Sequence, residues 1–184
     1  MNKGNTQRNV NSDNHTSEST ALIVVDVQNG FITPETEHVV YKIRDLITHN
    51  DFDYVVATEF INVDNSLFER QVNYSGMKDL PETLVDDIIA DNVDIIIPKT
   101  AYSPQQDLIE LLHDNNISRV IIVGIDTDAC VLATAFSTFD NNIETFILED
   151  CCASTGGNEV HIAALRVMRH SFGRDHVIFD MQSL

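Results

Sequence analysis

Short runs of aliphatic and β-branched residues alternate with helical patterns along most of the chain, and this alternation constrains the fold most. Most runs are continuously apolar, which is typical of strands buried on both faces of a parallel sheet. The segments between them place aliphatic residues three or four positions apart, as on the buried side of a helix. This order predicts a doubly wound α/β sheet. The predicted strands are Ala21–Val27, Tyr54–Thr58, Val93–Ile97, Arg119–Gly124, Ile143–Leu148 and His176–Phe179.

The length of 184 residues predicts one domain that is large enough to bury a core without disulfides or metals. Residues 1–19 are rich in Asn, Ser and Thr and contain hardly any core-forming residue. We therefore expect a disordered tail over residues 1–19 and one folded domain over residues 20–184.

Charge and cysteine usage limit the partners and the compartment. The chain has 11 Lys and Arg against 29 Asp and Glu, a formal net charge of −18, which argues against binding nucleic acid or an anionic membrane. The three cysteines suggest no disulfide framework, and neither a signal peptide nor a membrane span is apparent. We expect a cytoplasmic protein whose partner is a small-molecule substrate.

Three polar residues follow three of the predicted strands. Asp26 comes at the end of the first strand, Lys99 follows the third, and Cys130 lies shortly after the fourth. Because ligands of open parallel sheets bind at the carboxyl ends of the strands, these residues are candidates for one site. An Asp, a Lys and a Cys together could form a nucleophilic site with its own base.

Each of the three also has a simpler explanation. Cys130 could be a buried structural thiol, Asp26 a capping residue, and Lys99 a side chain that reaches solvent. Thr127 is a good N-cap for the apolar run Ala129–Phe139, which puts Cys130 in the first helical turn. There the helix dipole would lower the pKa of the thiol. One cluster accounts for all three residues better than three separate explanations.

A long connection follows the second predicted strand, roughly Glu59–Leu80. Long connections in compact domains are usually functional. The aromatic residues Phe60, Phe68 and Tyr74 lie in it and either form the wall of a pocket or pin a surface loop.

The segments ALIVVDVQNGF, IIPKTAYS and IIVGIDTDACVLATAF resemble the isochorismatase-like cysteine hydrolases, which include nicotinamidases and N-carbamoylsarcosine amidase. The resemblance runs from about Ala21 to Phe179. It implies a three-layer fold in which helices flank a six-stranded parallel sheet, and assembly as a homodimer or homotetramer. It also implies roles for single residues: Asp26 as the catalytic base, Lys99 as the catalytic lysine, Cys130 as the nucleophile, a cis peptide between Ile125 and Asp126, and an oxyanion hole formed by the N–H groups of Asp126 and Cys130.

The chain also departs from that family. Metal-containing nicotinamidases carry an Asp-x-His after the second strand, whereas this chain has Thr58–Asn62 without a histidine, so we expect no metal and no cofactor. Asp126 stands where many relatives have a small apolar residue, and it either shapes the pocket or faces solvent. By motif position the substrate-binding candidates are Gln28, Phe31, Phe60 and Tyr102, with Phe136 expected in the core and Cys151 and Cys152 as packing residues.

These observations predict a cysteine-dependent hydrolase of a small amide or carbamoyl C–N bond that works through a thioester. One alternative is vinyl-ether hydrolysis of the isochorismatase type, although Cys130 favours an amide. Other classes are a receiver-like domain, which would need an acidic pair after the first strand, and a non-catalytic small-molecule binding domain. The substrate stays open.

Overall fold

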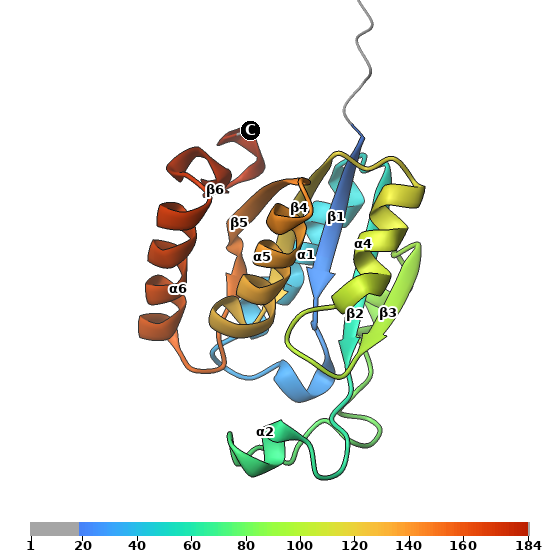
Figure 1. The fold of residues 1–184 in the computed structure, drawn as a ribbon, viewed down its shortest axis with the longest axis vertical. Coiled ribbons are helices and arrows are strands. Elements are labelled where there is room, and N and C mark those ends of the chain that lie inside the picture. The colour runs from blue at the N-terminus through green and yellow to red at the C-terminus, as the bar shows by residue number, and fades with distance from the viewer. Residues whose placement is uncertain (1–18, 184) are drawn as a thin grey trace, which may run out of the picture.

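A computed structural model describes residues 19–183 and shows six parallel strands in one sheet, in the order β3-β2-β1-β4-β5-β6. Figure 1 shows the strands with their carboxyl ends pointing to the side where α2 lies. The predicted α/β class, strand number and parallel direction are confirmed. The strands are β1 Thr20–Val25, β2 Tyr54–Phe60, β3 Ile95–Lys99, β4 Arg119–Ile125, β5 Glu144–Ala153 and β6 Val177–Ile178.

The predicted tail lies outside the described residues, except for Ser19. The Ser19 carbonyl accepts hydrogen bonds from the backbone N–H groups of Ser118 and Arg119, at 3.1 and 3.2 Å. Backbone hydrogen bonding between this part of the chain and the start of β4 therefore begins one residue before β1.

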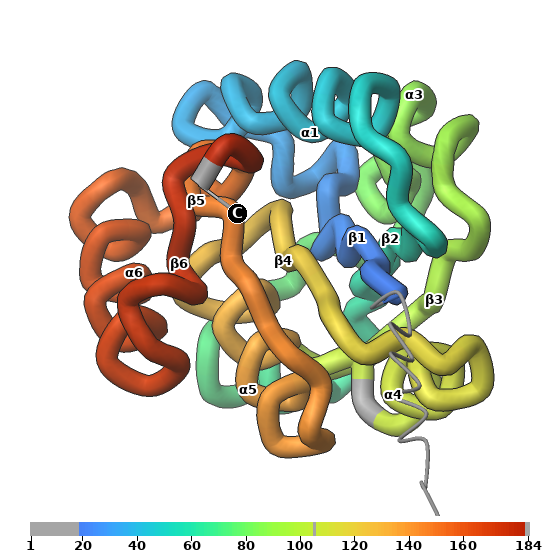
Figure 2. The backbone as a smooth tube through the Cα atoms, turned by 90° about the horizontal axis from the view of Figure 1, so that it is seen from above, coloured from blue at the N-terminus to red at the C-terminus, as the bar shows by residue number. Residues whose placement is uncertain are grey.

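Helices cover both faces of the sheet, which gives the three layers. Alternate residues of β1 show this directly: Ile23 belongs to a core with Leu108 of α4 and Leu165 of α6. The neighbouring Leu22 packs in a second core, on the side of α1 and α3. Figure 2 shows α1 and α3 on one side of the sheet and α4 and α5 on the other. The helices are α1 Glu37–His49, α2 Leu67–Arg70, α3 Asp87–Ala90, α4 Gln105–Asp114, α5 Leu132–Asp140 and α6 Asn158–Ser171.

The strand boundaries and one side-chain placement differ from the predictions. β2 and β5 continue into polar residues, β1 stops at Val25, and β6 has only two residues. A parallel strand continues as long as the neighbouring strand supplies backbone hydrogen-bond partners, and this does not depend on whether the side chains are polar or apolar. Phe136 was expected in the core, but it is 37% exposed and packs edge-on against Phe172 at a centroid distance of 4.9 Å. Cys151 and Cys152 are both buried.

The long connection after β2 holds the short helix α2 and otherwise little regular structure before α3. Figure 1 shows this segment beyond the carboxyl ends of the strands, where the ligand of such a sheet is expected. The described part of the chain has no helix long and apolar enough to cross a membrane.

Gly124 brings the ends of β1 and β4 into close contact. It pairs with Val25, and its φ of +124° lies in a region that side chains rarely adopt. A Cβ atom there would lie 2.1 Å from the Val25 carbonyl oxygen. Because Val25 precedes Asp26, this glycine sets the position of the first candidate site residue.

Substituting alanine at Gly124 is expected to destabilise the fold by more than the same change at Gly157. Gly157 also has a positive φ, of +88°, but open space surrounds its Cβ position. Gly157→Ala should therefore cost only backbone strain, about 1–3 kcal/mol of unfolding free energy. Gly124→Ala must also displace the Val25 backbone. Chemical denaturation measures both losses, and equal losses would contradict the steric argument.

Candidate active site

Asp26 is fully buried at the carboxyl end of β1, and Thr58 of β2 fixes its carboxylate. The Thr58 hydroxyl donates to Asp26 Oδ1 at 2.6 Å and accepts from the Asp26 backbone N–H at 3.2 Å. The residue has a φ of +48°, which turns the chain sharply after the strand. One carboxylate oxygen is thus held by Thr58, and the other, Oδ2, points to the next charged group.

That group is Lys99, at the end of β3. Its Nζ lies 2.7 Å from Asp26 Oδ2, and its side chain is only 1% exposed. The ammonium also donates to the Ala101 carbonyl at 2.9 Å and to Cys130 Sγ at 3.4 Å. Lys99 therefore does not reach solvent, and its ammonium forms an ion pair with a carboxylate and hydrogen bonds with a carbonyl and a thiol.

Cys130 lies in a π-helical turn, Thr127–Val131, between β4 and α5. The Asp126 carbonyl accepts from the N–H groups of Ala129 and Val131, which closes the turn. The prediction that Thr127 caps the helix is wrong, because its hydroxyl instead lies 2.8 Å from Nδ1 of His161. This wider turn carries Cys130 to the carboxyl edge of the sheet, where it is 7% exposed.

The electrostatics of the thiol also differ from the prediction. Burial raises the pKa of Cys130 well above its usual value, and the negative charge of Asp26 raises it further. Lys99 opposes this shift, and a hydrogen bond between Asp26 and the thiol adds to it. A helix dipole argument predicts the opposite sign, but desolvation of the thiolate and the adjacent carboxylate outweigh it.

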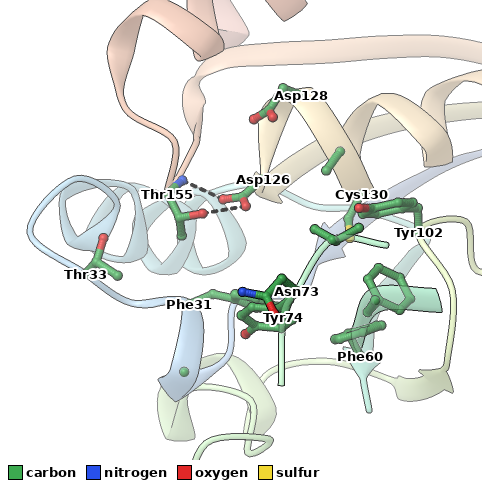
Figure 3. Close-up of a pocket in the computed structure, with 14 residues that line it drawn as sticks. Phe31, Thr33, Phe60, Asn73, Tyr74, Tyr102, Asp126, Asp128, Cys130 and Thr155 are labelled. Carbon is green, nitrogen blue, oxygen red and sulfur yellow. Dashed lines mark hydrogen bonds between the residues drawn. The ribbon is translucent and has the colours of Figure 1, made fainter. Parts of the chain in front are cut away.

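A cavity of about 430 Å³ opens above Cys130. That volume suits a small organic ligand. Aromatic rings form much of its wall: Phe68 lies edge-on to both Phe60 and Tyr102, each at a centroid distance of 4.8 Å. Figure 3 shows the nucleophile candidate on one side of the cavity and several of these rings around it. The aromatic lining residues are Phe31, Phe60, Phe68, Tyr74 and Tyr102.

The structure places Gln28 elsewhere than predicted. Its side chain is fully buried, accepts from the Phe60 N–H at 2.8 Å, and donates to the carbonyls of Phe60 and Thr83 at 3.0 and 2.7 Å. Both ends of the amide are therefore used to hold the loop after β2, and Gln28 is not among the residues lining the cavity. Phe31, Phe60 and Tyr102 do line it.

Asp126 faces the cavity, which answers the question left open by its sequence position. Its two carboxylate oxygens accept from the backbone N–H and the hydroxyl of Thr155, each at 2.6 Å (Figure 3). Burial raises its pKa, and the bonds from Thr155 oppose that rise. The peptide bond between Ile125 and Asp126 is cis.

Three residues of this site were not singled out by the sequence. Thr58 holds Asp26, Thr155 holds Asp126, and Asp128 lines the cavity while accepting from the Ser154 hydroxyl. Thr58 lies within β2, whereas Asp128 and Thr155 lie in the segments after β4 and β5. Thr and Asp are common in such segments for local reasons, so only the tertiary contacts reveal these roles. Among the residues that the structure describes, no group of three His, Cys, Asp or Glu side chains could hold a metal ion.

Polar side chains gathered at the carboxyl ends of a parallel sheet, below an aromatic cavity, are typical of α/β enzymes. Comparison with known proteins gives the family. The model of the isochorismatase domain matches residues 20–174, and the chain belongs to the isochorismatase family of hydrolases.

Relatives in this family include amidohydrolases. The chain is 27% identical to a ureidoacrylate amidohydrolase of Acinetobacter baylyi, over 85% of this chain and 79% of that protein. An N-carbamoylsarcosine amidase of Thermoplasma acidophilum has a similar structure, with a TM-score of 0.72 and 26% identity over 84% of this chain and 93% of the other. An isochorismatase-like hydrolase of Alkaliphilus metalliredigens shares the fold, with a TM-score of 0.75 and 20% identity over 87% and 93% of the two chains.

Asp26→Asn is expected to speed alkylation of Cys130 by iodoacetamide. The Asp26 charge raises the pKa of the thiol, so its removal lowers that pKa and increases the thiolate fraction at any pH between the two values. Mass spectrometry of the Cys130 peptide in mildly alkaline buffer measures the rate, with Cys151 and Cys152 as internal references. Circular dichroism checks that the variant is folded. A slower or unchanged alkylation rate in the folded variant would contradict the claim that the Asp26 charge raises the pKa of Cys130.

Proposed function

We propose that the chain is a cysteine-dependent hydrolase that cleaves a small amide or carbamoyl C–N bond through a thioester. The observation that carries this proposal is the position of Lys99 Nζ, 2.7 Å from Asp26 Oδ2 and 3.4 Å from Cys130 Sγ, at the base of the cavity. A base, a cation and a nucleophile in mutual contact are what acyl transfer requires.

The raised pKa of Cys130 means that the resting thiol keeps its proton. Attack on the substrate carbonyl carbon therefore requires the proton to pass from Sγ to the Asp26 carboxylate as the S–C bond forms. The carbonyl π electrons move to oxygen, where the backbone N–H groups of Asp126 and Cys130 serve as the oxyanion hole. When the C–N bond breaks, the nitrogen leaves with the proton from Asp26.

Hydrolysis of the thioester uses the same groups. Asp26 takes a proton from water as the water oxygen attacks the thioester carbonyl, and the C–S bond then breaks. The thiolate recovers the proton, which regenerates the resting site. Through both halves Lys99 stays charged, offsets the developing charge on sulfur and keeps the base oriented.

A thiol at this position favours amide over vinyl-ether chemistry, because covalent capture needs an acyl group to form a thioester. The names of two relatives also describe C–N bond hydrolases. Vinyl-ether cleavage remains a measurable outcome of the test below.

Cys130→Ala should lower turnover of small amides by at least about a thousandfold, because it removes the nucleophile. Ammonia release from a panel of amides, ureas and carbamates, and pyruvate release from isochorismate, measure the loss. Cys151→Ala is the matched control, since Cys151 is buried on the α1 side of the sheet and away from the cavity.

Mass spectrometry of the wild type during turnover should show an acyl adduct on the Cys130 peptide. Full activity of the Cys130→Ala protein, or isochorismate as the best substrate in the panel, would overturn the proposal.

A further inference from the structure

The charges that line the cavity are all of one sign. Asp126 and Asp128 contribute carboxylates to its wall, whereas no lysine, arginine or histidine is among the lining residues. Lys99 lies beneath the cavity with a 1% exposed side chain, and its charge is offset by Asp26. A substrate carboxylate would therefore meet no positive side chain in this wall.

Asp126 keeps capacity to bind a ligand. Thr155 donates one hydrogen bond to each of its oxygens, which holds the carboxylate in place and leaves a further lone pair on each oxygen. Within the described part of the chain, no basic side chain forms an ion pair with Asp126. The carboxylate is thus fixed, partly desolvated and without a counter-charge.

The tyrosines of the cavity respond to this negative field. Burial, followed by the charges of Glu82 and Asp126, raises the pKa of Tyr74 to about 12. For Tyr102, burial comes first, and the charges of Asp128 and Asp126 raise its pKa further. Asp126 contributes to both shifts, so its charge acts on both tyrosines of the cavity.

The walls suit a cation as well. The electron-rich faces of aromatic rings attract cations, and five such rings line the cavity. Apolar rings and a fixed carboxylate together favour an organic ammonium or pyridinium over a strongly hydrated anion.

We propose that Asp126 makes the cavity selective for a positively charged organic amide, with its carboxylate pairing with the cationic group while Cys130 faces the amide carbonyl. The part of this inference that concerns the reaction rests on the proposed amidase function. The charge preference rests on the cavity alone. Two of the relatives named above act on amides whose names denote carboxylic acids. The proposal therefore separates this chain from those relatives by the charge of its substrate.

Two isosteric sets of amides test the charge preference. The aliphatic set is β-alaninamide, butyramide and succinamate, and the aryl set is the N-methylpyridinium meta-carboxamide, meta-methylbenzamide and meta-carbamoylbenzoate. Each set varies the charge from positive to neutral to negative at nearly constant shape. Calorimetry on the Cys130→Ala protein measures binding without turnover, and ammonia release by the wild type measures kcat/KM.

In at least one set, the cation should bind about tenfold or more tightly than its neutral isostere, and the anion more weakly than both. In the Cys130→Ala background, Asp126→Asn should reduce the ratio of cation to neutral affinity to near one. Asp114→Asn, at an exposed position on α4, removes the same charge from the surface and should leave that ratio unchanged.

The two arms separate the two proposals. Cation preference in binding without ammonia release from any amide supports the charge preference and counts against the amidase. Ammonia release with no preference for the cation in either set, or an equal loss of preference in the Asp126→Asn and Asp114→Asn proteins, overturns the charge preference.

Discussion

The buried ion pair between Asp26 and Lys99 is the interaction on which the rest of the site depends. Removing two charges from water costs several kcal/mol per ion, and such a pair is tolerated only when hydrogen bonds satisfy the remaining groups. Here Thr58 holds the carboxylate and the Ala101 carbonyl holds the ammonium. The pair joins the ends of β1 and β3 across β2. The geometry of the site therefore depends on the order of the strands in the sheet.

Both members of this pair also act on the pKa of Cys130, in addition to the larger effect of burial. Lys99 lies close to Cys130 Sγ, yet its charge is shared with Asp26, and the thiol remains protonated because its pKa is raised. A site of this kind avoids a permanently exposed thiolate, which is the form that oxidants and alkylating agents attack. In the proposed mechanism, deprotonation accompanies bond formation with the substrate, and the carboxylate that raises the pKa of the resting thiol is the base that removes its proton.

The sequence predicted the six strands, apart from their boundaries, and the proximity of Asp26, Lys99 and Cys130, but not the environment of these residues. Continuous apolar runs identify buried strands, and a polar residue directly after such a run identifies the edge where Asp26 and Lys99 meet. The π-helical turn that contains Cys130 has no regular hydrophobic period from which the sequence could predict it. The position of Gln28 in the motif predicts a pocket residue, and only the structure shows that its amide binds backbone groups instead. The predicted direction of the Cys130 pKa shift was wrong. The helix dipole can be inferred from the local sequence, whereas desolvation of the thiol depends on how the whole fold packs around it.

The acidity of the chain and the acidity of the cavity act at different ranges. A formal charge of −18 spread over the chain attracts cations in general, but salt screens exposed charges beyond about 8 Å at physiological ionic strength. Asp126 is partly buried and held by Thr155, so its contact with a bound cation is screened much less. The surface therefore affects how often a cation arrives, and Asp126 affects how long it stays. Because added salt weakens the first effect more than the second, discrimination between a cationic amide and its neutral isostere should persist at an ionic strength that removes the general attraction.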